Sequence, residues 1–104
     1  MSNLQVDMPQ PSQDQFLEKA KRLAVESYNK RIEGQPQADE VRISIDDVFV
    51  VWFSKTLQNW KALVGTTIPG ESAYFELTYD GDKKQTYIDL YEKLSNEVYP
   101  DVSS

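Results

Sequence analysis

Apolar residues recur at spacings of three and four between residues 13 and 33, which is the pattern of an α-helix with one buried face. These apolar positions are Phe16, Ala20, Leu23, Ala24 and Tyr28. Ser12 and Gln15 have the spacing of a capping box, in which each side chain bonds the backbone amide of the other residue. Because Gly34 and Pro36 follow the apolar stripe, we predict that the helix ends before Gly34.

Three later segments have the β-branched and aromatic composition that is typical of strands. Residues 48–53 are apolar at odd and even positions alike, which predicts a central strand buried on both faces. Residues 60–67 are expected to return beside it after a polar turn, and residues 74–79 are expected to form the third strand. Between helix and strands, residues 34–40 read as a connector, and the alternation at residues 41–45 favours a short extended segment.

The pattern after Asp80 and Gly81 fits two structures. An Asp-Gly pair after a strand favours a tight hairpin. The apolar residues that follow nevertheless recur at helical spacings, and they are Tyr87, Leu90, Tyr91, Leu94 and Val98. Asp82 can cap a helix there, so we predict a second helix that ends near Tyr99, because Pro100 follows.

The expected order of elements is therefore α-β-β-β-α. It predicts an α+β fold with two layers, in which two helices pack on one face of a three-stranded antiparallel meander. Residues 1–12 are rich in Pro and Gln and are expected to form a flexible arm. Residues 13–100 are expected to form a single domain, followed by a tail at residues 101–104.

The chain of 104 residues contains neither cysteine nor histidine. Disulfides, thiolate or imidazole metal sites and a Ser-His-Asp triad are thereby excluded. The four glycines are scattered, so no phosphate-binding loop is present. We therefore expect a protein that is not an enzyme and that needs no cofactor and no metal.

The longest strongly apolar run has six residues, from Val48 to Phe53, which is too short to span a bilayer. The first five residues lack the basic and apolar regions of a signal peptide. We therefore expect a cytoplasmic protein without a membrane partner.

The net charge of −6 is unevenly distributed along the chain. Acidic residues gather in residues 34–47 and 69–82, whereas residues 48–68 contain Lys55 and Lys61 and no acid. An acidic face of this kind can meet a basic partner, although ordinary solubility also explains it.

The strongest candidate site lies around the turn expected between the first two strands. Its residues are Trp52, Lys55, Gln58, Asn59, Trp60 and Lys61. Aromatic rings beside cations suit protein interfaces and nucleic-acid strands alike. The alternative is that both tryptophans are core residues and that the lysines only solubilise the strand edge. If one tryptophan is exposed, we expect it to be Trp60, because it lies at the turn.

A secondary set of candidates belongs to the expected second helix and consists of Lys83, Lys84, Tyr87 and Tyr91. Surplus tyrosine there favours a homodimer. The α-β-β-β-α order is also that of double-stranded RNA-binding domains, whose last helix begins with a basic cluster. Because affinity for nucleic acid depends on neutralising phosphates, the charge of −6 disfavours this role.

One stretch of the sequence is distinctive: Trp-Phe-Ser-Lys-Thr-Leu-Gln-Asn-Trp-Lys at residues 52–61. Together with residues 46–51, residues 79–84 and the Tyr-rich segment after them, it resembles a family of uncharacterised small proteins encoded by phages and prophages of Gram-positive bacteria. The resemblance covers residues 14–98. It implies a phage setting and an early or accessory gene, and it brings no catalytic residues.

These observations predict a non-catalytic protein-binding module that acts on a host or phage protein. One alternative is a nucleic-acid-binding domain that needs several side chains on one face, namely Lys55, Trp60, Lys61, Lys83 and Lys84. The other is a homo-oligomeric structural or scaffolding component of a phage particle.

Overall fold

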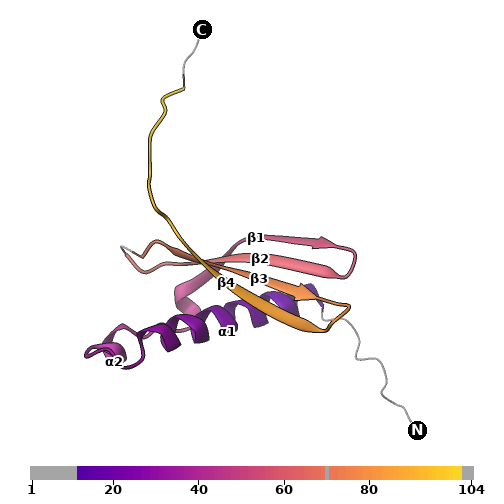
Figure 1. The fold of residues 1–104 in the computed structure, drawn as a ribbon, viewed down its shortest axis with the longest axis horizontal. Helices are drawn as coiled ribbons and strands as arrows, with labels where there is room; N and C mark the ends of the chain where they lie inside the picture. The colour runs from indigo at the N-terminus through magenta and orange to yellow at the C-terminus, as the bar shows by residue number, and fades with distance from the viewer. Residues whose placement is uncertain (1–11, 70, 102–104) are drawn as a thin grey trace.

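The computed structural model describes residues 12–69 and 71–101. Its elements, in chain order, are α1 (Gln13–Ile32), α2 (Ala38–Val41), the 3-10 turn η2 (Ile45–Asp47), β1 (Val48–Thr56), β2 (Asn59–Thr66), β3 (Ala73–Asp80) and β4 (Gln85–Glu92). The strands form one antiparallel sheet in the order β1-β2-β3-β4 (Figure 1). The predicted α+β class is confirmed. The expected flexible arm and most of the expected tail lie outside the described residues.

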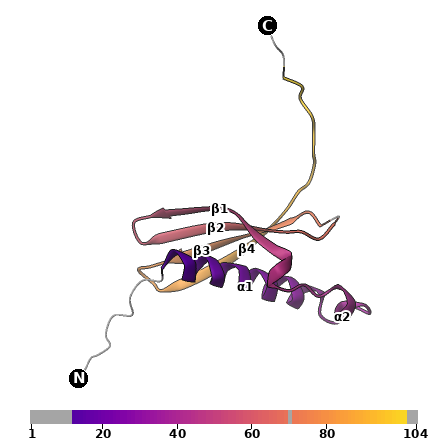
Figure 2. The same ribbon diagram turned by 180° about the vertical axis from the view of Figure 1, so that it is seen from behind.

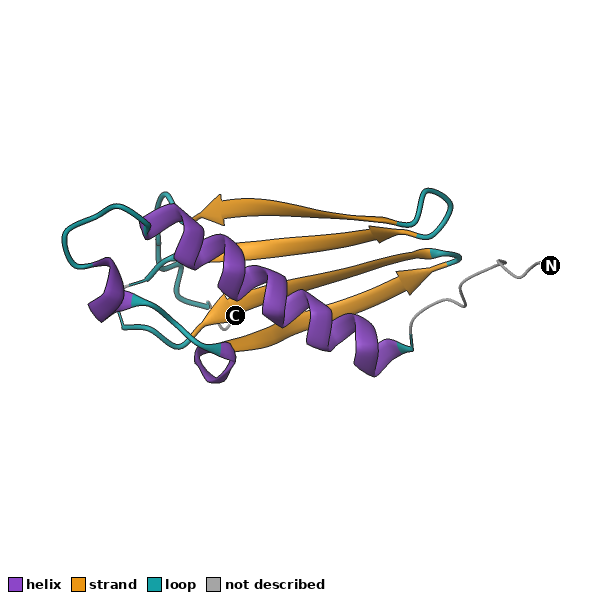
Figure 3. Cartoon of the chain, turned by 90° about the horizontal axis from the view of Figure 1, so that it is seen from below, coloured by secondary structure: helices purple, strands orange, loops and turns teal. Residues whose placement is uncertain are grey.

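Helix α1 begins at the predicted capping box. The Ser12 side chain accepts a hydrogen bond from the Gln15 amide, and the Gln15 side chain accepts one from the Ser12 amide. The helix then crosses one face of the sheet diagonally (Figure 3). Phe16, Ala20 and Ala24 are buried against that face, so the small alanines let the helix approach the strands closely.

The core lies between α1 and the sheet. Three rings from three elements meet at one end of it, with centroids 5.5 Å apart for Phe16 and Trp60, 5.7 Å for Phe53 and Trp60, and 5.9 Å for Phe16 and Phe53. Tilted and edge-on pairs at these distances are favourable arrangements of aromatic side chains. Phe75 and Leu77 of β3 are completely buried beside this cluster.

The predicted second helix is wrong, because residues 85–92 form the fourth strand instead. Asp80 Oδ1 accepts hydrogen bonds from the amides of Asp82 and Lys83, and Lys84 takes a φ of 55°. These contacts turn the chain back, and β4 then pairs with β3 along its whole length. Pairing satisfies the otherwise free backbone groups of β3, which outweighs the helical spacing of the apolar residues.

The predicted antiparallel meander is present, but it has four strands rather than three, and it packs against one long helix rather than two. In the described part of the chain, α1 is the one long helix, and the four-residue α2 buries none of its side chains. Strand β1 also differs from its prediction, since it is an edge strand rather than a central one. Phe49, Val51 and Trp52 of β1 are each more than two-fifths exposed, because no second layer among the described residues covers the far face of the sheet.

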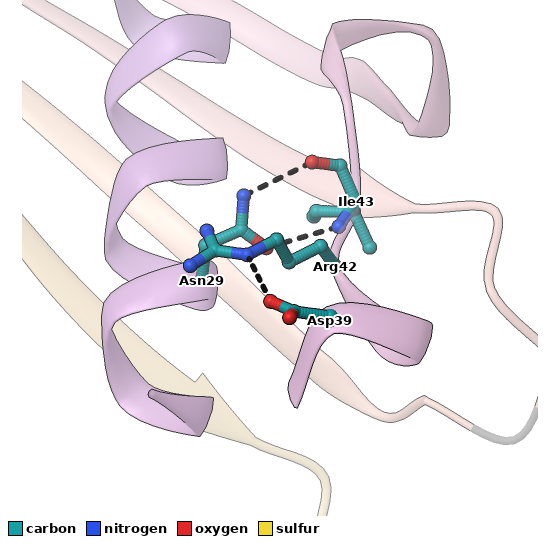
Figure 4. Close-up of polar contacts among 4 residues, drawn as sticks. All are labelled: Asn29, Asp39, Arg42 and Ile43. Carbon is teal, nitrogen blue, oxygen red and sulfur yellow. Dashed lines mark hydrogen bonds and ion pairs between the residues drawn. The ribbon is translucent and has the colours of Figure 1, made fainter. Parts of the chain in front are cut away.

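A polar clamp fixes the connector against α1 (Figure 4). The Asn29 side-chain amide donates to the Ile43 carbonyl at 3.0 Å, and its oxygen accepts from the Ile43 amide at 2.9 Å. Arg42 pairs with Asp39 at 3.4 Å across the same turn. The predicted extended segment at residues 41–45 is interrupted, because Val41 ends α2 and Ile45 begins η2.

Residues 93–101 form an extended segment, here called the C-terminal arm, that leaves the end of β4. It rises on the side of the sheet opposite α1 in both side views (Figures 1 and 2). Lys93 bonds the Ser72 carbonyl through its amide at 3.3 Å, close to the start of the arm. Beyond that point Leu94, Val98 and Tyr99 are 96%, 82% and 79% exposed.

Candidate functional site: the open face of the sheet

The side of the sheet that faces away from α1 is here called the open face. Side chains alternate between the two faces of a strand, so the strand register assigns each residue to one of them. The residues opposite one another on adjacent strands form rows that run across the open face. The chemical character of these rows changes from one end of the sheet to the other.

The row nearest the C-terminal arm is aromatic. In this row Phe49 of β1 pairs with Gly65 of β2, and Tyr74 of β3 pairs with Tyr91 of β4. A Cβ placed on Gly65 would lie 3.0 Å from the Phe49 ring and 3.2 Å from the Tyr74 ring. A glycine at this position therefore allows two rings from different strands to close over the backbone between them.

The next row joins an apolar half to an acidic half. Trp52 pairs with Leu63, Leu63 with Glu76, and Glu76 with Asp89. Trp52 is 41% exposed, although it lies beside a strand whose other face is in the core. The first two rows together place five large side chains on one end of the open face, and they are here called the aromatic patch: Phe49, Trp52, Leu63, Tyr74 and Tyr91.

A small polar network borders the aromatic patch. Lys61 Nζ lies 3.7 Å from Glu76 Oε1, and the Tyr91 hydroxyl donates to the same oxygen at 3.3 Å. The charge of Glu76 and this hydrogen bond raise the pKa of the Tyr91 hydroxyl above its ordinary value. The Tyr91 hydroxyl thus acts as a hydrogen-bond donor that holds the Glu76 carboxylate at the edge of the patch.

The far end of the open face is mainly polar. Its two rows contain Ser54, Lys61, Thr78, Tyr87, Thr56, Asn59, Asp80 and Gln85. Tyr87 is the large ring of this end, and its hydroxyl donates to Gln85 at 2.8 Å. The open face is thus graded from an aromatic end near the arm to a hydrophilic end at the hairpin turns.

The two tryptophans do not lie together. Trp60 is 3% exposed and faces α1, so the expectation that it would be the exposed tryptophan is wrong. Lys55 covers its ring from the same face, with Nζ 4.9 Å from the ring centroid. A bulge between Val50 and Trp52 shifts the alternation of β1 by one residue. It turns Phe53 into the core and Trp52 onto the open face.

The remaining predicted site residues lie on different parts of the molecule. The Gln58 carbonyl accepts a hydrogen bond from the Gly81 amide at 2.9 Å, which joins the two hairpin turns. Lys83 and Lys84 belong to the second of these turns. Lys61 lies on the open face and Lys55 on the helix face, so the set required for nucleic-acid binding is not brought onto one face.

Phe49 and Leu63 are not among the site residues predicted from the sequence, although both belong to the aromatic patch. Alternation within residues 73–80 does indicate that Tyr74 and Phe75 face opposite sides. What the sequence lacks is any sign of which face is covered. That property depends on the missing second helix, and it decides whether the aromatic rings are core or surface.

Within residues 12–69 and 71–101, no group of three or more acidic side chains is placed to hold a metal ion. No helix of the described part is long and apolar enough to cross a membrane. Among known families, the model of a family of unknown function, DUF6275, matches residues 17–101 of the chain. No curated protein and no solved structure matches the chain.

Proposed function

The chain belongs to a family of unknown function, and we propose that it is a non-catalytic protein-binding module whose docking surface is the aromatic patch. The observation that carries the proposal is the exposure of this patch. Phe49, Trp52 and Tyr91 each remain more than two-fifths exposed on one end of one sheet face. Contiguous apolar surface of this kind marks interaction sites in proteins that otherwise bury such side chains.

The residue types of the patch fit a protein partner. Tryptophan and tyrosine dominate the energetics of protein interfaces, because they bury a large area and lose few rotameric states. The Glu76 carboxylate and Asp89 border the patch on the β3 and β4 side. A partner with an apolar protrusion and a basic group beside it would complement both features.

The charge of the open face favours protein over nucleic acid. Lys61 is its one cation among the described strand residues, and it already pairs with Glu76. Asp80 and Asp89 add negative charge on β3 and β4. Aromatic rings can stack on bases, but binding to a nucleic-acid strand also needs cations along its phosphates.

The setting we propose is that of a phage or prophage accessory protein in the cytoplasm of a Gram-positive host. The support is the sequence resemblance carried by residues 52–61 and the segments around them. The partner is then a host or phage protein.

The test is capture on immobilised protein from host lysate, with and without phage infection. Wild-type chain and a Leu57→Ser control should retain the same partner, and Trp52→Ser should lose it. Leu57 is a matched control because it is an 85% exposed apolar residue in the β1–β2 turn, outside the patch. Equal capture by wild type and Trp52→Ser would contradict the proposal, and so would recovery of neither another protein nor further copies of this chain from both lysates.

A further inference from the structure

We infer that the aromatic patch takes a second copy of this chain, and that the two copies pack open face to open face and exchange their C-terminal arms. This inference rests on the proposed function, because it names the partner of the same surface. Two features of the chain lack a partner within the described residues. One is the aromatic patch, and the other is the arm with its three exposed apolar side chains.

Both features lie at the same end and on the same side of the sheet. The arm starts at the end of β4, next to Tyr91 of the aromatic row. Seen from the α1 side, the arm passes behind the sheet, which is the side of the open face (Figure 3). A second sheet stacked on the open face at about 10 Å lies directly in the path of this arm.

The arm is unsuited to covering its own patch. Its apolar side chains Leu94, Val98 and Tyr99 are 96%, 82% and 79% exposed, so in the single chain they do not pack on the sheet that the arm has just left. An extended chain of nine residues reaches about 30 Å. That length is enough to cross the neighbouring sheet completely.

The two copies are related by a two-fold axis, which we place over the gap between β2 and β3 and parallel to the strands. In this arrangement the charges of the two open faces are complementary. A rotation about this axis places β2 of each copy over β3 of the other. Lys61 of each copy then faces the strand that carries Glu76 of the other. In the same arrangement β4 lies over β1, so Tyr91 meets the strand that carries Phe49 and Trp52.

The area of the open face is too small for a stable dimer formed by face-to-face contact alone, and exchange of the arms adds to it. A four-stranded face with eight residues per strand measures about 19 Å by 26 Å, or roughly 1,000 Å² when both copies are counted. Stable interfaces bury about 1,200–2,000 Å² in total. Two arms, each with Leu94, Val98 and Tyr99, supply the missing apolar area.

The free edge of β1 completes the arrangement. β4 of one copy lies over β1 of the other, so each arm leaves its sheet beside an edge strand whose outer backbone groups have no strand partner in the described chain. An extended segment can add to such an edge through main-chain hydrogen bonds.

The first test is the oligomeric state, measured by sedimentation velocity over a wide range of protein concentration. Wild type and Leu57→Asp should form the same dimer, whereas Trp52→Ser and the arm variant Leu94→Asp/Val98→Asp should each weaken it at least tenfold. The arm variant keeps the measurement interpretable, because Leu94 and Val98 are 96% and 82% exposed in the single chain and their replacement should not disturb the fold. A wild-type monomer at high concentration, or a dimer unaffected by both variants, would overturn the inference.

The second test uses the natural absence of cysteine. Val98→Cys and Val51→Cys proteins are mixed under mild oxidation, which places one thiol on the arm and one on the edge strand. A disulfide between the two different chains is the expected product. A link within a single chain carrying both substitutions, and none between chains, would show that the arm covers its own sheet and would overturn the exchange.

The two proposals can fail separately. If wild type is a monomer and Trp52→Ser still abolishes capture of another protein, the second copy is ruled out while the docking surface stands. If neither a dimer nor a captured protein depends on Trp52, both proposals are wrong.

Discussion

Single residues determine which surfaces of this protein are buried and which are exposed. Asn29 holds the connector with two hydrogen bonds, and Gly65 leaves room for the Phe49 and Tyr74 rings to lie close to its backbone on the outer face. At Val51 a single bulged residue reverses the sides of Trp52 and Phe53. Each of these residues acts through backbone geometry, so its effect extends beyond its own contacts.

Replacing Asn29 by alanine should lower the free energy of unfolding by about 1–3 kcal/mol, because the amide and carbonyl of Ile43 would lose their partners in a partly buried place. Urea unfolding measures the change. Asp39→Ala is the matched control, since it removes only an exposed ion pair and should change stability by at most about 0.5 kcal/mol. Equal losses in both variants would mean that the clamp does not hold the connector.

Tyr91 should titrate above its ordinary pKa in the folded protein. Glu76→Gln should lower the pKa of Tyr91, because it removes the charge that opposes the phenolate. Asp89→Asn should have a smaller effect, since Asp89 contributes the least of the causes that raise the pKa. Phenolate absorbance against pH, referred to Tyr91→Phe, separates this hydroxyl from the other tyrosines. An unchanged Tyr91 titration in Glu76→Gln would contradict the network.

At the scale of elements, the sequence predicts well what is decided locally. The capping box at Ser12 and the apolar stripe of α1 are local signals, and both are confirmed. Three of the four strands also follow from composition, with bounds that differ from the prediction by a few residues. The nature of residues 85–92 is not decided locally, because their apolar spacing suits a helix and their pairing with β3 requires a strand.

The loss of one predicted helix explains why the site was only partly predictable. Trp52 was a candidate, and it lies on the open face as a member of the patch. The sequence predicts that Trp60 is the more exposed tryptophan, but its ring packs in the core against Phe16 and Phe53. A sequence can show that a strand has two different faces, whereas only the assembled layers show which face remains uncovered.

The arm should behave as an element that is separable from the domain. Removing residues 94–104 should leave the circular dichroism spectrum and the unfolding midpoint of the monomer unchanged, because Leu94, Val98 and Tyr99 are largely exposed in the single chain and the hydrogen bond from Lys93 to Ser72 is kept. The comparison is made at a protein concentration at which sedimentation velocity shows a monomer. A clear loss of stability in the dilute truncated protein would mean that the arm packs on its own domain.

At the scale of the whole molecule, the described residues form a four-stranded sheet that is covered on one face and exposed on the other. Helix α1 and the connector close the inner face over a dense aromatic core, while the outer face grades from an aromatic patch to polar turns. The excess negative charge of the chain fits this arrangement, since it keeps an exposed apolar surface soluble and disfavours phosphate-rich partners. Recognition of protein, by a second copy or by another chain, is the role that this division of faces supports best.

The exposure of Trp52 tests most directly whether the aromatic patch is a docking surface. Trp60→Phe leaves Trp52 as the sole tryptophan, and it should be tolerated because the indole N–H of Trp60 has no hydrogen-bond partner to lose. Acrylamide quenching of Trp52 fluorescence is then measured in the dilute single chain and in the complex, whether with a second copy or with a captured protein. Quenching should be efficient in the single chain, and Trp52 should be strongly protected from it in the complex. A complex that forms while Trp52 stays equally accessible would contradict the docking role of the patch.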